Sequence, residues 1–181
     1  MRPSEKLAPT KTAGLLAGVA FCLLAAGCGP RGAAECDTPS RQPVPRFVAL
    51  EYNEINARKG PGEDHRILWT WHAKGMPVEV VAETSDWRKV RGPDGVAAWV
   101  HKRGLTGDMN VMRIKPGAVA LHASPKDDAA VVAWLKPSAV AGLEKTQGDW
   151  RELKASGTRG WVRASEVWGA GGPTPCLPRE R

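Results

Sequence analysis

The feature that most constrains this chain is an internal repeat with an offset of about 62 residues. Residues 74–100 contain the runs K-G-M-P-V, D-W-R-K-V and W-V, and residues 136–162 contain K-P-S-A-V, D-W-R-E-L and W-V in the same order. A period of this size is typical of duplicated supersecondary units. The repeat therefore predicts two similar small domains in tandem.

Each unit has the pattern of short strands separated by turns. In the run P-V-E-V-V-A, Val78 and Val80 fall on one face and Glu79 on the other, as in a half-buried strand. The run G-P-D-G at 92–95 lies between two apolar runs and indicates a hairpin. No sustained helical periodicity follows the N-terminal region, so each unit is expected to consist of strands. Strands this short can bury a core only by curling into a small barrel. Strands of the first unit are expected at 55–58, 67–71, 77–82, 87–91 and 96–100.

The order of these motifs resembles that of bacterial SH3-like domains. The first unit carries N-A-R-K-G-P-G at 56–62, K-G-M-P-V at 74–78, W-R-K-V at 87–90 and W-V at 99–100. The lead-in P-R-F-V-A-L at 45–50 resembles one subgroup of exported tandem SH3-like proteins. The resemblance implies an all-β fold of two tandem small SH3-like β-barrels after a cleaved N-terminal signal segment.

The second unit departs from the family pattern at two places. Lys136-Pro replaces the Lys-Gly turn, and His122-Ala-Ser-Pro replaces the Arg-x-Gly-Pro loop. The resemblance therefore extends to the fold of this unit and leaves a shared ligand site there open. The expected domains are 44–106 for the first barrel and 111–168 for the second, with a C-terminal tail at 169–181.

The N-terminal region resembles an export signal. Lys6 and Lys11 precede an uncharged apolar stretch at 13–26 that is too short to span a bilayer about 30 Å thick. We therefore expect a signal peptide at 1–27, of secretory or lipoprotein type, and a disordered tail at 28–43. The chain is expected to be exported to the periplasm or cell envelope, with secretion as the less favoured destination.

The cysteines bear on how the exported chain is anchored. The run L-A-A-G-C ending at Cys28 resembles a lipoprotein box, which would make Cys28 a lipidation site. The alternative is ordinary signal cleavage near residues 32–34, which gives a soluble protein. Cys36 and Cys176 form a candidate disulfide in an oxidising compartment, and the alternative is two free thiols.

Charge and motifs argue against several function classes. The formal net charge is +7 and the isoelectric point is about 9.5, yet acidic and basic residues are interspersed without a basic run, so no nucleic-acid partner is expected. The histidines lack the spacing of a metal site, and no nucleophile or phosphate-binding motif is present. We expect no enzyme activity, no catalytic residues, no cofactor and no metal.

The tryptophans are the most informative residues for function. All eight lie after residue 60, and strand periodicity places Trp87 and Val90 on opposite faces. If Val90 is core, Trp87 faces outward, where aromatic rings beside basic groups can grip a peptide or glycan. The alternative is that the rings only cap a small barrel. The candidate ligand-binding residues are Arg58, Trp71, His72, Trp87, Lys89, Trp99, Trp150 and Trp161.

These features predict a noncatalytic binding module of the cell envelope. The resemblance implies that the partner is peptidoglycan, another cell-wall polymer, or a peptide or envelope protein. The alternative is an accessory subunit that docks onto an envelope enzyme or secretion complex. Membrane contact is expected only through a lipid anchor on Cys28.

Overall fold

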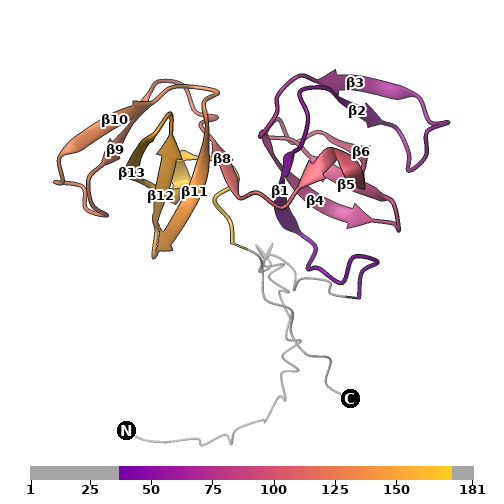
Figure 1. Cartoon of the computed structure of the whole chain (residues 1–181), viewed down its shortest axis with the longest axis horizontal. Helices are drawn as coiled ribbons and strands as arrows, with labels where there is room; N and C mark the ends of the chain where they lie inside the picture. Colours follow the sequence, from indigo (N-terminus) through magenta and orange to yellow (C-terminus); the bar gives the residue numbers. More distant parts are fainter. Residues whose placement is uncertain (1–36, 173–181) are drawn as a thin grey trace, which may run out of the picture. The chain divides into compact units, whose positions relative to one another are not determined.

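The computed structural model describes residues 37–172, and Figure 1 shows that they form two β-sheets, β1–β7 and β8–β13. The predictions of a signal peptide, of lipidation at Cys28 and of a Cys36–Cys176 disulfide concern residues outside the described range. No helix within residues 37–172 is long and apolar enough to cross a membrane. The predicted fold class, an all-β chain of two tandem small SH3-like barrels, is confirmed.

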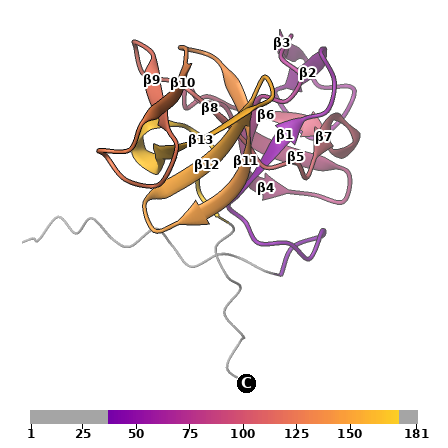
Figure 2. The ribbon, with the colours of Figure 1, turned by 60° about the vertical axis from the view of Figure 1, so that its left-hand side comes forward.

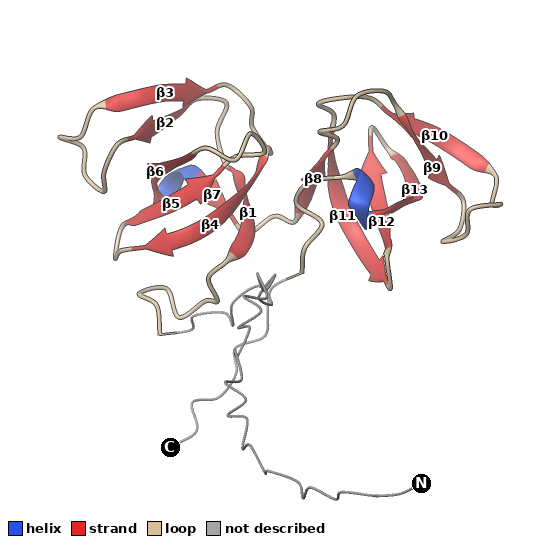
Figure 3. Cartoon of the chain, turned by 180° about the vertical axis from the view of Figure 1, so that it is seen from behind, coloured by secondary structure: helices blue, strands red, loops and turns tan. Residues whose placement is uncertain are grey.

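The first sheet contains seven antiparallel strands in the order β3-β2-β6-β5-β4-β1-β7. The strands expected from the sequence are present, and two further ones, β1 and β7, extend the sheet beyond the predicted five. A short 3-10 turn at Lys102–Gly104, blue in Figure 3, separates β6 from β7. The strands are β1 (Arg46–Leu50), β2 (Ile55–Arg58), β3 (Ile67–Trp71), β4 (Pro77–Glu83), β5 (Trp87–Arg91), β6 (Ala97–His101) and β7 (Leu105–Thr106).

The second sheet repeats this arrangement with six antiparallel strands in the order β10-β9-β13-β12-β11-β8. Figure 2 shows β9 and β10 as a hairpin at the margin of this sheet, with β10 as the edge strand. A second 3-10 turn, Ala164–Glu166, follows the last strand. The strands are β8 (Asn110–Met112), β9 (Val119–His122), β10 (Val131–Leu135), β11 (Val140–Gln147), β12 (Trp150–Ala155) and β13 (Thr158–Arg163).

Each barrel has its own apolar core, which explains why the alternating patterns of the sequence fold into two units. In the first barrel Leu50, Val78 and Val90 are fully buried, as strand periodicity requires of inward positions. In the second barrel Leu121 and Leu153 are 1% and 0% exposed. The cores come from the same inward phase of corresponding strands, so the repeat in the sequence is also a repeat in packing.

Backbone hydrogen bonds define which residues of the two barrels correspond. The Gly75 N–H donates to the Leu50 carbonyl at 2.8 Å, and the Ser138 N–H donates to the Arg113 carbonyl at 2.8 Å. Gly75 and Ser138 have φ values of 81° and 62°, so both occupy the left-handed region at the same turn. Ser138 therefore performs the backbone role of Gly75, although serine adopts this conformation less readily.

The segments that flank the barrels also contact them. The Ser40 N–H donates to the Glu83 carboxylate at 2.8 Å, and Ala170 lies in the second core at 6% exposure. Residues 37–43 and 169–170, which the sequence analysis assigned to tails, thus make defined contacts with the barrels.

Candidate ligand-binding face

The outer face of β5 and β6 carries half-buried aromatic and basic side chains. On β5, Arg88 and Val90 point into the barrel, whereas Trp87 and Lys89 point outward. The same alternation on β6 buries Val100 and leaves Trp99 partly exposed. Trp87 and Trp99 therefore point outward, as strand alternation predicts.

Antiparallel pairing brings these side chains into one strip. Trp99 stands opposite Arg58 on β2 and opposite Lys89 on β5. Two residues along, Trp87 stands opposite His101, and their ring centroids are 5.3 Å apart in an edge-to-face arrangement. Directly opposed residues on adjacent strands lie close enough for their side chains to interact. We call Arg58, Trp87, Lys89, Trp99 and His101 the cationic–aromatic strip.

Arg58 also fixes the loop that borders the strip. Its Nη1 donates to the carbonyls of Glu63 and His65 at 2.9 and 2.8 Å. The His65 ring packs so closely on Gly60 that a Cβ there would lie 2.5 Å from it. A side chain at residue 60 would therefore require the exposed His65 ring to move.

Two of the predicted ligand residues lie elsewhere. Trp71 pairs with the buried Ile55, packs against the first core and stacks edge-on against Trp69 with centroids 5.4 Å apart. His72 is exposed at the end of β3. The structure therefore does not place Trp71 and His72 in the strip.

The corresponding row of the second barrel has a different composition. Trp161 stands between His122 on β9 and Glu152 on β12, in place of the arginine and lysine that flank Trp99. Glu152 also forms an ion pair with Lys145 at 2.8 Å. Trp161 is only 8% exposed and offers little surface to a ligand.

Trp150, the counterpart of Trp87, is also buried, at 7% exposure. The Arg163 guanidinium lies 4.3 Å above its ring centroid, and the His122 ring meets it edge-on at 5.8 Å. Arg163 also binds Asp127 at 2.5 Å, and this hydrogen bond is the main cause that lowers the pKa of Asp127. Arg163 thus interacts with both the Trp150 ring and the Asp127 carboxylate, and Trp150 is a packing residue of this barrel.

A buried ion cluster lies on the inward face of β4 and β5, behind the strip. The Oε2 atom of Glu83 accepts a hydrogen bond from Arg46 Nη2 at 2.8 Å and forms an ion pair with Arg88 Nε at 3.0 Å. The side chains of both arginines are 9% exposed and that of Glu83 is 1% exposed. Burial alone would raise the pKa of Glu83, but hydrogen bonds from Ser40 and Arg46 and the charge of Arg46 together lower it to about 2.

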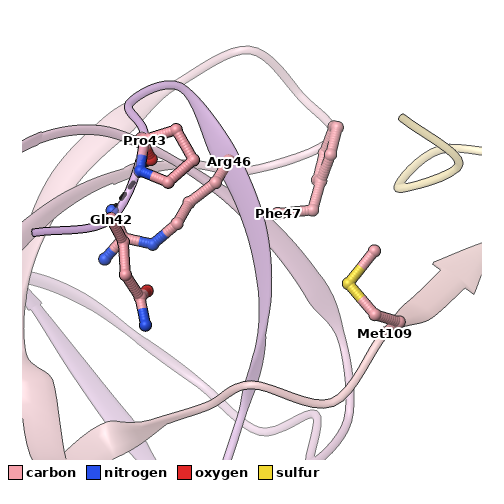
Figure 4. A pocket seen from close by; sticks show the side chains of 5 residues that line it. All are labelled: Gln42, Pro43, Arg46, Phe47 and Met109. Carbon is pink, nitrogen blue, oxygen red and sulfur yellow. Dashed lines mark hydrogen bonds between the residues drawn. The ribbon is translucent and has the colours of Figure 1, made fainter. Parts of the chain in front are cut away.

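A pocket of about 150 Å³ lies next to this cluster (Figure 4). In that view the side chains of Gln42, Pro43 and Arg46 lie on one side of β1 and those of Phe47 and Met109 on the other. The Arg46 Nη1 donates to the Pro43 carbonyl at 3.1 Å. Its Nε is buried and has no hydrogen-bond acceptor among the described residues.

The second barrel has no equivalent of this cluster among the described residues, because the pair Glu83–Arg88 corresponds to Thr146–Arg151. Without a carboxylate opposite it, Arg151 donates through Nε to the carbonyl of Ala170 at 2.9 Å. The inward arginine of each barrel therefore contacts a flanking segment. Arg88 is linked to the N-terminal segment through Glu83, which binds Ser40, and Arg151 binds the C-terminal segment directly.

Sequence reasoning missed His101, Arg46, Glu83 and Arg88 as parts of a site. Arg88 and Arg151 had a signal, because both follow the tryptophan of the repeated D-W-R run and share the inward phase of the strand with Val90 and Leu153. Arg46 and Glu83 had none, since they meet only through a contact across 37 residues. Within residues 37–172 no group of three or more His, Cys, Asp or Glu could hold a metal ion.

Comparison with known proteins agrees with this geometry. The family model described as a bacterial SH3 domain matches residues 51–107 and again residues 112–169. No curated protein matches the chain.

Solved structures similar to this chain include NlpC2 and NlpC1 from Trichomonas vaginalis, each 12% identical to it. Their TM-scores are 0.32 and 0.31, and the matches cover 68% and 75% of this chain. The chain spans about half the length of these structures, with 48% of each covered.

Proposed function

The chain belongs to the bacterial SH3 domain family, and from that premise we propose that it is a noncatalytic binding module of the cell envelope. Its ligand is peptidoglycan or another anionic cell-wall polymer, and the first barrel carries the binding face. The proposal includes export to the periplasm or envelope, as the sequence of the N-terminal region indicates.

The cationic–aromatic strip is the observation that carries this proposal. Arg58 and Lys89 flank Trp99 on adjacent strands, so a flat ring stands between two positive charges. Such a row suits a polymer that presents sugar or peptide faces for stacking together with carboxylates for the cations. Its second-barrel counterpart has Glu152 in place of Lys89 and a buried Trp161, which favours one binding face over two.

Retention of the purified full chain on cell-wall sacculi tests the proposal. Trp99→Ala should weaken retention about tenfold, since stacking on one aromatic ring contributes about 1 kcal/mol or more. The matched control is Trp134→Ala, which removes the most exposed tryptophan side chain of the second barrel, at 63% exposure. The thermal transition of each variant separates a loss of binding from a loss of folding.

Two results would contradict the proposal. Equal losses for Trp99→Ala and Trp134→Ala would show nonspecific adhesion of exposed rings. Release of soluble wall fragments by the pure chain would show that it is an enzyme and not a passive module.

A second candidate function, docking onto an envelope enzyme or secretion complex, is favoured by the edge strand β10. Val131, Val132 and Trp134 are 46%, 45% and 63% exposed on a strand with one unpaired edge. Exposed apolar edge strands are typical places for another chain to add. In this case sacculi would not retain the chain, and a single protein would co-purify with it in a way that Trp134→Ala abolishes.

A further inference from the structure

The pocket beside the buried ion cluster has the charge of an anion site. Arg46 and Arg88 both bind Glu83, so these three groups together carry one positive charge more than negative. All three side chains are at most 9% exposed, where water screens their charge poorly. Of the two arginines, Arg46 is the one that lines the pocket, so the excess charge acts on whatever occupies it.

One nitrogen of the Arg46 guanidinium has no hydrogen-bond partner among the described residues. Nη1 donates to the Pro43 carbonyl and Nη2 to Glu83, but the buried Nε has no acceptor among residues 37–172. Nearly all buried donors in folded proteins are paired, and an unpaired donor on a charged group is particularly unfavourable. An anionic oxygen would both accept a hydrogen bond from Arg46 Nε and balance the excess positive charge.

The remaining walls select what the anion is attached to. Pro43, Phe47 and Met109 present apolar surface, and a cavity near 150 Å³ admits a group about the size of benzene. The exposed Gln42 lines the pocket as well, and its carboxamide offers the donor and the acceptor that a peptide group requires.

We propose that this pocket binds the free C-terminal carboxylate of a peptide whose last residue is small and apolar. The carboxylate accepts from Arg46 Nε, the terminal side chain packs against Phe47 and Met109, and Gln42 binds the preceding peptide group. Because Nε is buried, part of the pocket wall has to move as the ligand enters. The site is separate from the cationic–aromatic strip and does not depend on wall binding there.

The first test uses N-acetyl-alanine as the probe and N-acetyl-alanine amide as its uncharged match. The full chain, labelled with ¹⁵N, is titrated with each while the Nε–H signal of Arg46 is followed by NMR. The acid should shift this signal saturably and at least about tenfold more tightly than the amide. Equal effects of acid and amide, or no saturation, would overturn the proposal. Equally tight binding of acetate would also overturn it, since the apolar walls would then contribute nothing.

Variants supply the second test. Met109→Asp places a carboxylate in the pocket wall without touching the ion cluster, and it should abolish binding of the acid. Thr146→Asp is the matched control, because it adds the same charge at an exposed position of β11 in the second barrel and should leave binding unchanged. Full binding by a folded Met109→Asp variant, judged by its thermal transition, would place the ligand elsewhere.

Discussion

The two barrels share strand order and pairing register, yet they use the same positions for different purposes. In the first, Trp99 is only partly buried between Arg58 and Lys89, whereas in the second the buried Trp161 stands between a histidine and a glutamate. The backbone pattern depends on inward residues and turns, which the repeat preserves. Outward residues are under no such constraint, so a duplicated barrel can lose a binding face without losing its fold.

The inward arginines show the same divergence on the opposite face of the strands. Arg88 binds a carboxylate that also holds Arg46 and Ser40, while Arg151 binds the carbonyl of Ala170. The first barrel therefore depends on buried charge, and the second depends on a neutral acceptor. The following substitutions test this contrast and that of the outer rows.

The largest effect is expected for Glu83→Gln. It leaves Arg46 and Arg88 buried without their counter-charge, so unfolding of the first barrel should become easier by about 3–5 kcal/mol. Thr146→Val, at the corresponding position of the second barrel, should change stability by less than about 0.5 kcal/mol because this residue is exposed. Urea unfolding followed through NMR signals of each barrel measures both, and similar losses would remove the contrast.

Acid should also destabilise the first barrel more than the second. Because the folded-state pKa of Glu83 lies below its usual value of 4.5, at about 2, its contribution is complete above pH 4.5 and is lost as pH falls to about 2. The shift corresponds to about 3 kcal/mol. Unfolding free energies of the wild type and Glu83→Gln, measured across this range, should converge at low pH. A constant difference between them would show that the Glu83 carboxylate is not the titrating group.

A charge exchange in the outer rows sharpens the comparison of the binding faces. Lys89→Glu gives the first barrel the glutamate of the second and should weaken retention on sacculi about tenfold, or about 1.4 kcal/mol. The reverse change, Glu152→Lys, should raise retention less than about twofold, since Trp161 stays buried. A gain comparable to the loss would show that both barrels bind.

The sequence predicts the fold of this chain more completely than its candidate site. Strands β2 to β6 were predicted within one residue at each end, because period-2 alternation and the turn at 92–95 are local signals. Strands β1 and β7 were not counted, since β7 has two residues and pairs only with β1, far away in the chain. Local pattern therefore predicts strands, while the closure of the barrel depends on distant pairing.

For the site, alternation identified Trp87 and Trp99, and the expectation of basic groups beside them identified Arg58 and Lys89; the structure brings these four residues together. The same pattern also selected Trp150, whose burial depends on Arg163 and His122 packing against its ring. Burial of an outward residue is decided by its neighbours on other strands. A repeat in the sequence predicts the strand position and face of a side chain, but not whether neighbouring side chains bury it.

The smallest effect concerns the shared turn. Ser138→Gly should stabilise the second barrel by less than about 1 kcal/mol, because glycine adopts a φ of 62° without steric cost but loses more chain entropy on folding. Gly75→Ser should destabilise the first barrel by a similar amount. Thermal unfolding of both variants measures the pair, and a destabilising Ser138→Gly or a stabilising Gly75→Ser would refute the structural correspondence of the two turns.

The anchoring of the N-terminal segment through Glu83 also bears on how this protein can be dissected. A fragment cut at the family boundary, residue 51, would omit both Ser40 and Arg46 and would leave Glu83 with Arg88 alone. Such a fragment would contain every residue of the cationic–aromatic strip and still lack strand β1, which pairs with β4. An autonomous first domain therefore has to start ahead of residue 40, well outside the region that sequence similarity marks as the domain.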